Sequence, residues 1–205
     1  FLALGVIAGI LIGTYGGETF KKSVDDKSIA VLPFDNFSKN EDDEFFTAGI
    51  TEDITMNLAK IKDLTVISRT SVMGYKNSTK KMKIIADELG VKYILEGSVR
   101  KLGNRVRIVG QLIDAKSDKH VWSDSYDRDM NDLFQIQADV SKEIANAMQA
   151  ELSDQTIAQI ESVPTDNMEA YELYKKARTY HYRSFRETDF NLAVDYYREA
   201  IELEP

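Results

Sequence analysis

The 205-residue sequence has no cysteine, only two histidines and only three prolines. The absence of cysteine excludes disulfide frameworks, thiol nucleophiles and cysteine-based zinc or iron–sulfur sites. A histidine-rich metal site is excluded too, and a catalytic histidine would have to be His120 or His181. With so few prolines and 11 glycines, the chain is neither collagen-like nor proline-rich.

The sequence also lacks an excess of positive charge. It has 26 Lys and Arg against 34 Asp and Glu, which gives a net charge of -8. A general electrostatic attraction to nucleic acid is therefore not expected from these residues. Hydrophobic residues make up 43% and charged residues 29%, as in ordinary globular proteins. The length allows one domain plus a small second unit.

One long uncharged run stands at the start of the sequence. Residues 1–15 read FLALGVIAGILIGTY, and fifteen helical residues span about 22 Å, less than the roughly 30 Å of a bilayer core. We interpret the run as a truncated transmembrane helix; a cleaved signal peptide or a buried core helix are the alternatives. Because the sequence begins inside this run at Phe1, we expect the natural protein to continue at both ends.

The next segments follow the pattern of an α+β domain. After a polar linker at 16–27, residues 28–153 predict the order β-α-β-α-β-β-β-α, with parallel pairing early and hairpins late. The expected strands are 28–34, 64–68, 92–102, 105–114 and 120–126, and the expected helices are 45–61, 80–89 and 129–152. Residues 154–167 are expected to form a second linker, and 168–205 to form two helices separated by 183–189.

A family resemblance rests on the stretches SIAVLPFDNFS, DDEFFTAGITEDI, LTVISRTSVMGYK, ADELGVKYILEGSVRK and VRIVGQLIDAKSDKHVW. Together they resemble the TolB-like (TolB N-terminal-type) domain, over residues 28–153. The resemblance implies a bacterial inner-membrane protein with a single span and residues 16–205 in the periplasm. Lys21 and Lys22 would by themselves favour the cytoplasmic side. The resemblance implies no catalytic residues.

Residues 168–205 resemble one tetratricopeptide repeat. The small residues Ala177, Ala193 and Ala200 and the closing Pro205 fall in the order of that pattern. The interval between Tyr180 and Ala193 is about four residues longer than in the standard unit, which leaves the position of the turn open. A single repeat buries its apolar face poorly, so we expect further repeats after Pro205.

No motif for catalysis or for a cofactor is present. The sequence contains no glycine-rich phosphate loop, no GxSxG and no HExxH. An acidic cluster surrounds Tyr126; it consists of Asp124, Asp127, Asp129 and Asp132. Helix capping by Asp129 and Asp132 is the favoured interpretation, with acid–base catalysis or metal binding as the alternative. We therefore expect no enzyme activity, no catalytic residue, no metal and no cofactor.

Several other polar residues are expected to have ordinary structural roles. Glu52 and Asp53 are placed on the solvent face of their helix, His120 on a sheet surface and Trp122 in the core. Four arginines could form an anion site but are expected to be solvated: Arg69, Arg100, Arg105 and Arg107.

The favoured binding residues are Tyr171, Tyr174, Arg178 and His181. Their spacing of three, four and three places them along one stripe of a helix. By resemblance, this stripe lines the concave peptide-binding surface of tetratricopeptide repeats, and Tyr and Arg are frequent interface residues. Packing against the TolB-like domain or against a further repeat is the alternative.

Two functions remain open from the sequence. The first is a membrane-anchored, non-enzymatic protein-interaction or sensory module of the bacterial envelope, with a protein or peptide as partner through the repeat and the membrane as partner through residues 1–15. The second is the extracytoplasmic sensory half of a transmembrane regulator. Its output part, before Phe1, would be a winged-helix transcription factor or an adenylyl cyclase.

Overall fold

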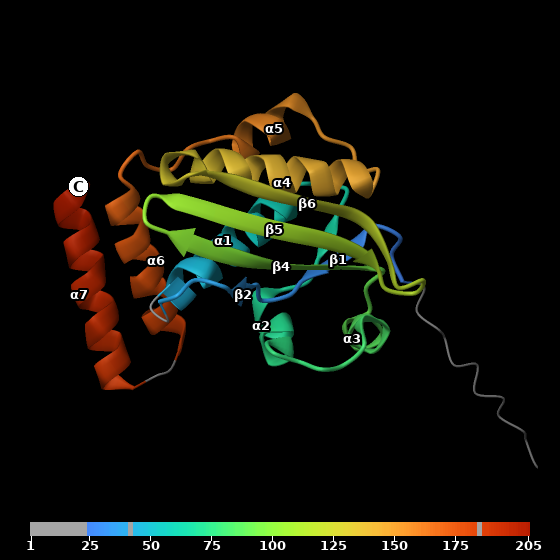
Figure 1. The fold of residues 1–205 in the computed structure, drawn as a ribbon, viewed down its shortest axis with the longest axis horizontal. Helices are drawn as coiled ribbons and strands as arrows, with labels where there is room; N and C mark the ends of the chain where they lie inside the picture. Colours follow the sequence, from blue (N-terminus) through green and yellow to red (C-terminus); the bar gives the residue numbers. More distant parts are fainter. Residues whose placement is uncertain (1–23, 41–42, 184–185) are drawn as a thin grey trace, which may run out of the picture.

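The computed structural model describes residues 24–40, 43–183 and 186–205 (Figure 1). The expected transmembrane segment at 1–15 lies outside the described residues. Within the described part of the chain, no helix is long and apolar enough to cross a membrane.

Six strands of the described chain form one sheet at the centre of the molecule. Its order is β3-β1-β4-β5-β6, and β2 pairs separately with β4. The strands are β1 (Ser28–Val31), β2 (Asp35–Asn36), β3 (Thr65–Val66), β4 (Tyr93–Leu102), β5 (Arg105–Asp114) and β6 (Lys119–Asp129). β1 runs parallel to β3 and β4, whereas β4, β5 and β6 form antiparallel hairpins. The predicted change from parallel to antiparallel pairing is confirmed.

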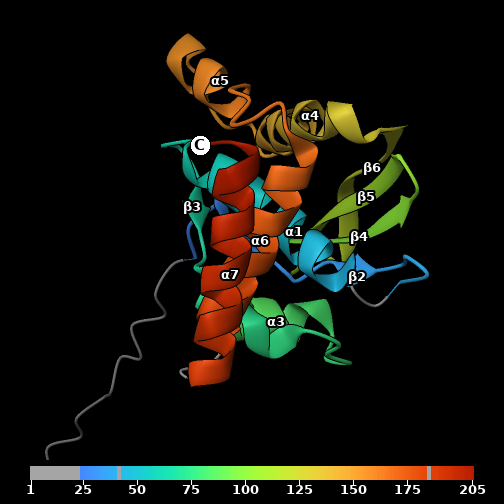
Figure 2. The same ribbon diagram turned by 90° about the vertical axis from the view of Figure 1, so that its left-hand side faces the viewer.

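Helices cover both faces of the sheet and extend beyond one end of it (Figures 1 and 2). They are α1 (Asp43–Ala59), α2 (Arg69–Val72), α3 (Met82–Leu89), α4 (Leu133–Ala147), α5 (Asp154–Ile160), α6 (Met168–Arg183) and α7 (Glu187–Leu203), with 3-10 turns η1 (Met73–Tyr75) and η2 (Met130–Asp132). Helices α6 and α7 lie side by side as a hairpin, and α6 is the one closer to the domain (Figure 1). The predicted helical hairpin is thus present.

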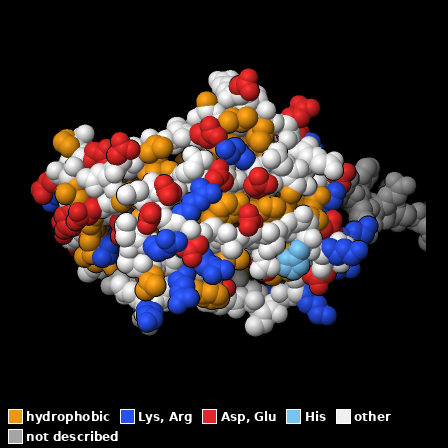
Figure 3. Space-filling model, turned by 45° about the horizontal axis from the view of Figure 1, so that its top comes forward, with side chains coloured by type: hydrophobic (Ala, Val, Ile, Leu, Met, Phe, Trp, Pro, Cys, Tyr) orange, Lys and Arg blue, Asp and Glu red, His pale blue; other side chains and the backbone are white. Residues whose placement is uncertain are grey.

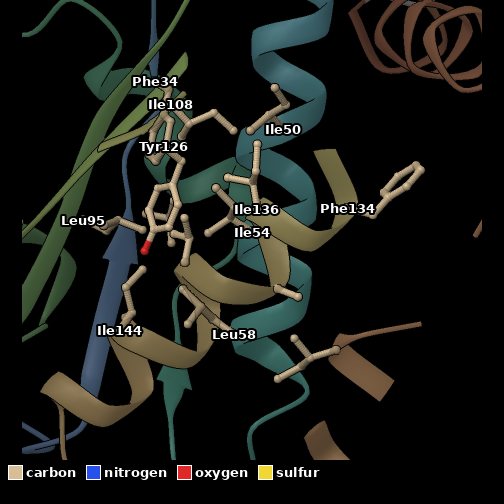
Figure 4. Packing of buried hydrophobic residues seen from close by; sticks show 14 of the residues in the cluster. Phe34, Ile50, Ile54, Leu58, Leu95, Ile108, Tyr126, Phe134, Ile136 and Ile144 are labelled. Carbon is tan, nitrogen blue, oxygen red and sulfur yellow. The ribbon is translucent and has the colours of Figure 1, made fainter. Parts of the chain in front are cut away.

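The main core lies between the sheet and the helices α1 and α4. Ile50, Ile54 and Leu58 follow one another along α1 at helical spacing and are fully buried. They face sheet side chains such as Leu95 and Ile108, as Figure 4 shows. Burying an aliphatic side chain of this size contributes about 1.5–3 kcal/mol. This cluster therefore supplies most of the cohesion of the α+β domain.

A second, smaller cluster lies on the opposite face of the sheet. Ala30 and Leu32 alternate with the residues of β1 that face the main core, and they pack with Val72 of α2 and with Ile85 and Ala86 of α3. Because strand side chains alternate between faces, β1 is buried on both sides. This explains its uninterrupted apolar sequence.

The α+β class is confirmed, but some expected boundaries are wrong. The helix expected at 129–152 begins at Leu133, because β6 continues its pairing with β5 as far as Asp129. It ends at Ala147, close to Gln149, whose φ of 54° is incompatible with a helix. The expected linker at 154–167 contains α5, which is capped by Ser153 and anchored by the buried Ile160.

The predicted N-cap hydrogen bond of Asp129 is absent, whereas Asp132 does lie at a helix N-terminus as predicted. Asp129 and Asp132 occupy the N-cap positions of η2 and α4, but neither side chain makes a capping hydrogen bond. Asp124 instead accepts a hydrogen bond from the backbone N–H of Ser125, at 2.7 Å. Asp127 pairs with Arg105 at 2.5 Å on the exposed surface of the sheet.

Candidate functional site

The helix α6 approaches α1 very closely at Gly49. A Cβ atom at this position would lie 2.9 Å from Cγ of Lys175, closer than real contacts allow. The glycine therefore lets the aliphatic part of Lys175 cross the surface of α1. As a result, α6 packs directly against α1, and the hairpin lies against one end of the α+β domain (Figure 1).

A buried polar network lies at the centre of this interface. The carboxylate of Asp53 on α1 pairs with the ammonium group of Lys175. It also accepts hydrogen bonds from the hydroxyl of Tyr171 at 2.5 Å and from Nε2 of Gln137 at 3.3 Å. Lys175 is only 4% exposed. A buried ammonium needs such a counter-charge, so the pair fixes where α6 sits.

Tyr171 joins the polar network to the apolar core. Its ring meets that of Phe134 edge to face, with centroids 4.9 Å apart. Burial, followed by the negative charge of Asp53, raises the pKa of the Tyr171 hydroxyl well above its ordinary value. The hydroxyl therefore remains a proton donor to Asp53 throughout the physiological pH range.

Further contacts extend the interface along α6. Arg178 pairs with Glu52 of α1 at 2.5 Å and donates to the Tyr174 hydroxyl at 3.3 Å. Lys101 of β4 pairs with Glu172. Several partly buried ion pairs therefore hold the hairpin to the domain, in addition to aromatic contacts between them.

A cavity of about 590 Å³ opens beside this network. Its walls come from α1, α4, α6, α7 and the segment that joins α5 to α6. The aromatic rings that line it are Phe134, Tyr171, Tyr174 and Tyr197. In Figure 4, Phe134 points away from the main core, toward the helices at the right of the view. The volume lies within the range of sites for small organic ligands.

The structure divides the predicted binding stripe into two parts. Tyr171 is buried against the α+β domain, Arg178 is paired with it, and Tyr174 is 41% exposed at the cavity. His181 lies outside the cavity, with its ring stacked on Tyr182 at 4.8 Å. The alternative interpretation, packing against the domain, therefore applies to Tyr171. Binding of a protein or peptide by the stripe stays a prediction.

Sequence reasoning missed the α1 side of this site. Glu52 and Asp53 were expected on a solvent face, but both pair with basic residues of α6. The sequence signal was an acidic pair on one helix and Lys175 and Arg178 on another. Nothing in the sequence alone showed that these two faces meet.

The remaining candidates do not converge on a site. Arg105 is paired with Asp127, and His120 is exposed on β6. Trp122 is half-buried, with its ring over Gly110. Burial and the charge of Asp124 raise the pKa of Tyr126 to about 12, so it is neutral at physiological pH. Among the described residues, no group of three or more acidic or histidine side chains could hold a metal ion.

Most of this chain aligns with one part of a longer protein. The chain is 43% identical over 151 residues to "Putative adenylate cyclase 3" of Rhizobium meliloti (strain 1021). The alignment covers 74% of this chain and 26% of that protein. The chain therefore spans about a quarter of the length of this relative.

Solved structures give partial matches. TolB from Acinetobacter baumannii has a TM-score of 0.45 and 16% identity, over 59% of this chain and 28% of that chain. Lipoprotein GNA1162 from Neisseria meningitidis has a TM-score of 0.46 and 20% identity, over 58% and 97%. The LpoB C-terminal domain from Salmonella enterica has a TM-score of 0.41 and 18% identity, over 54% and 87%.

A family model matches the α+β domain itself. Residues 25–147 match the family described as HilA/YgeH-like transcriptional regulator, second domain. This segment coincides with most of the part that resembles the TolB-like domain, and it makes up more than half of the 205 residues. The chain therefore belongs to this family, and its α+β domain corresponds to the second domain of HilA/YgeH-like transcriptional regulators.

Proposed function

We propose that this chain is a non-enzymatic sensory and interaction module of a larger regulator. One observation carries the proposal. The same kind of segment is the second domain of a transcriptional regulator family and a quarter of a protein named as an adenylate cyclase. A module that accompanies two different outputs is suited to controlling an output and need not perform either one.

The interface between α1 and α6 supports a regulatory role. The hairpin is held by charged and hydrogen-bonded side chains, and a cavity lies beside these contacts. A ligand or partner that binds there changes the free energy of the contact between the two units. Such differential binding is the physical requirement for transmitting a signal.

We further propose that the module is attached to the bacterial inner membrane through residues 1–15, with residues 16–205 in the periplasm. The uncharged sequence of this run supports the anchor. Acidic side chains gather at the end of the molecule that holds α7 (Figure 3), which gives nucleic acid no favourable surface there. An alkaline phosphatase fused after Pro205 is expected to be active; an inactive fusion would place this end in the cytoplasm.

A charge exchange tests the regulatory function. In the full-length natural protein, Arg178→Glu or Glu52→Arg alone places like charges together, whereas the double exchange restores an attractive pair. Genome-wide transcription and cellular cyclic AMP would both be measured. We expect each single variant to change one of these outputs and the double variant to restore it, at equal protein level. Unchanged outputs in both single variants would reject the proposal.

A direct contact with a protein partner is a second candidate function. The tip of the hairpin exposes Tyr182 by 63% and Phe190 by 57%, next to His181. Exposed aromatic side chains are typical of protein contacts. A photoreactive residue at position 182 is expected to crosslink one discrete partner in cells, whereas the same residue at position 102, where Leu102 is 62% exposed, is not. Equal labelling from both positions would contradict this function.

A further inference from the structure

Two charged residues that line the cavity beside α1 and α6 have no oppositely charged partner among the described residues. Lys60 and Glu204 both line it, and neither forms an ion pair with any residue in the described part of the chain. The other charged residues of the cavity differ, since Asp53 and Lys175 pair with each other and Arg178 pairs with Glu52.

The two unpaired charges are held by α5 and by the segment that follows it. The ammonium group of Lys60 donates to the backbone oxygen of Gln159 and to Oδ1 of Asn57, each at 2.9 Å. These two bonds leave one of its three hydrogens for a further acceptor. Glu204 accepts a hydrogen bond from the hydroxyl of Thr165. A positive and a negative group therefore both belong to the wall of the cavity.

Much of the remaining lining is apolar, and small residues leave the space open. Ala170 and Ala200 line it where larger side chains would reduce the space. Tyr174, Tyr197 and Phe134 provide ring surfaces. Rings of this kind bind apolar or aromatic groups by stacking and by burial of surface.

We propose that this cavity binds a small zwitterion with a large apolar side chain, of the class of apolar amino acids and dipeptides. Its carboxylate would lie at Lys60, its ammonium group at Glu204 and its side chain among the tyrosine rings. The inference deepens the proposed regulatory function and rests on it. A ligand that spans from α1 to α7 stabilises the docked hairpin and so strengthens the link between the two units.

Calorimetric titration of the full 205-residue chain tests the proposal. The probes are L-phenylalanine and L-phenylalanyl-L-phenylalanine, which separate the charged groups by different lengths. N-acetyl-L-phenylalanine lacks the ammonium group, and phenethylamine lacks the carboxylate. We expect at least one zwitterion to bind and both charge-deficient analogues to bind tenfold more weakly or worse. No binding of either zwitterion, or equal binding of all probes, would overturn the proposal.

Matched variants locate the binding. Lys60→Gln and Glu204→Gln are each expected to weaken binding about tenfold, which corresponds to about 1.4 kcal/mol. Lys62→Gln is the control, because Lys62 is exposed and does not line the cavity. Ile201→Glu at the cavity should abolish binding, whereas Leu203→Glu on the same helix should preserve it. Unchanged affinity in Lys60→Gln and Glu204→Gln would overturn the assignment.

The two proposals can fail separately. If the charge exchange at Glu52 and Arg178 alters the output but no zwitterion binds, the regulatory function stands and the ligand class is wrong. If a zwitterion binds but the charge exchange has no effect on output, the site exists and the regulatory function is wrong.

Discussion

The two sides of α1 are held by different kinds of interaction. Toward the sheet, α1 presents Ile50, Ile54 and Leu58, all fully buried among other apolar side chains. Toward the hairpin it presents Gly49, Glu52 and Asp53, which meet charged side chains of α6. One helix thus joins an apolar core to an interface that contains buried charges.

This difference explains how one part of the chain can change its contacts while another keeps the fold. Apolar burial is non-directional and does not depend on the charge state of any group. The polar interface depends on a few charges in fixed geometry, and removing one partner leaves the other buried without compensation. The hairpin is therefore the part whose docking a charge or a ligand can change.

The largest loss of stability is expected from a substitution that creates a cavity in the core. Ile54→Ala removes a fully buried side chain from the cluster that α1 forms with the sheet and α4. We expect a loss of about 4 kcal/mol in the free energy of unfolding, as for other large-to-small core substitutions. Urea unfolding followed by circular dichroism measures it. A loss below about 1 kcal/mol would mean that this side of α1 does not carry the cohesion of the domain.

The second largest effect is expected when one charge of the buried pair is removed. Asp53→Asn keeps the shape but leaves the ammonium group of Lys175, 4% exposed, without its counter-charge. We expect the hairpin to open about a hundredfold more often, which corresponds to about 3 kcal/mol. Amide hydrogen exchange should increase in α6 and α7 and remain unchanged in β4 and β5.

Two further variants interpret that result. Adding Lys175→Met to Asp53→Asn should restore protection, because no uncompensated charge remains. Asp127→Asn, which breaks the exposed pair with Arg105, should leave exchange unchanged. If Asp53→Asn accelerated exchange equally in the sheet, the two sides of α1 would not be energetically separate.

The sequence was sufficient for the domain because its elements have strong local signals. The unbroken apolar run of β1, the Gly103-Asn104 turn and the periodic apolar residues of α1 each predict one structure. The short elements were missed for the opposite reason. β2 has two residues, and it is a strand only because β4 lies next to it. A pairing of that kind has no signal within its own segment.

The candidate site was predicted only in part, because it depends on two distant segments meeting. The stripe on α6 was visible from its spacing, and three of its four residues do lie at the interface or the cavity. Asp53 was not visible as part of a site, since an acidic residue in a helix is most often solvated. Its partner Lys175 lies 122 positions away in the chain.

A smaller effect is expected at the close approach of the two helices. Gly49→Ala adds a Cβ that would lie 2.9 Å from Lys175 and must displace it. We expect the free energy that protects the amide hydrogens of α6 from exchange to fall by about 1 kcal/mol. The strain at this contact outweighs the higher helix propensity that alanine gives α1. Gly74→Ala is the control, because a Cβ there meets no atom within 4 Å. Increased protection of α6 in Gly49→Ala would show that the contact is not tight.

An effect of similar size, which disappears at high pH, is expected at Tyr171. Tyr171→Phe removes the hydrogen bond to Asp53 and should lower the free energy of unfolding by about 1 kcal/mol at pH 8.

In the wild-type chain the folded state holds the Tyr171 proton more tightly than the unfolded state, because the pKa of the hydroxyl is raised. The corresponding stability is fully present below about pH 10, the unfolded pKa, and is lost as the pH rises above it. The phenylalanine variant has no hydroxyl to ionise and does not lose this stability. The difference in the free energy of unfolding between the two chains should therefore shrink between pH 8 and pH 11. Urea unfolding of both chains at each pH measures this difference, in which the ionisation of all other tyrosines and lysines cancels. Parallel stability curves would mean that Tyr171 is not held as a buried proton donor, and that the polar side of α1 is more open to water than its contacts indicate.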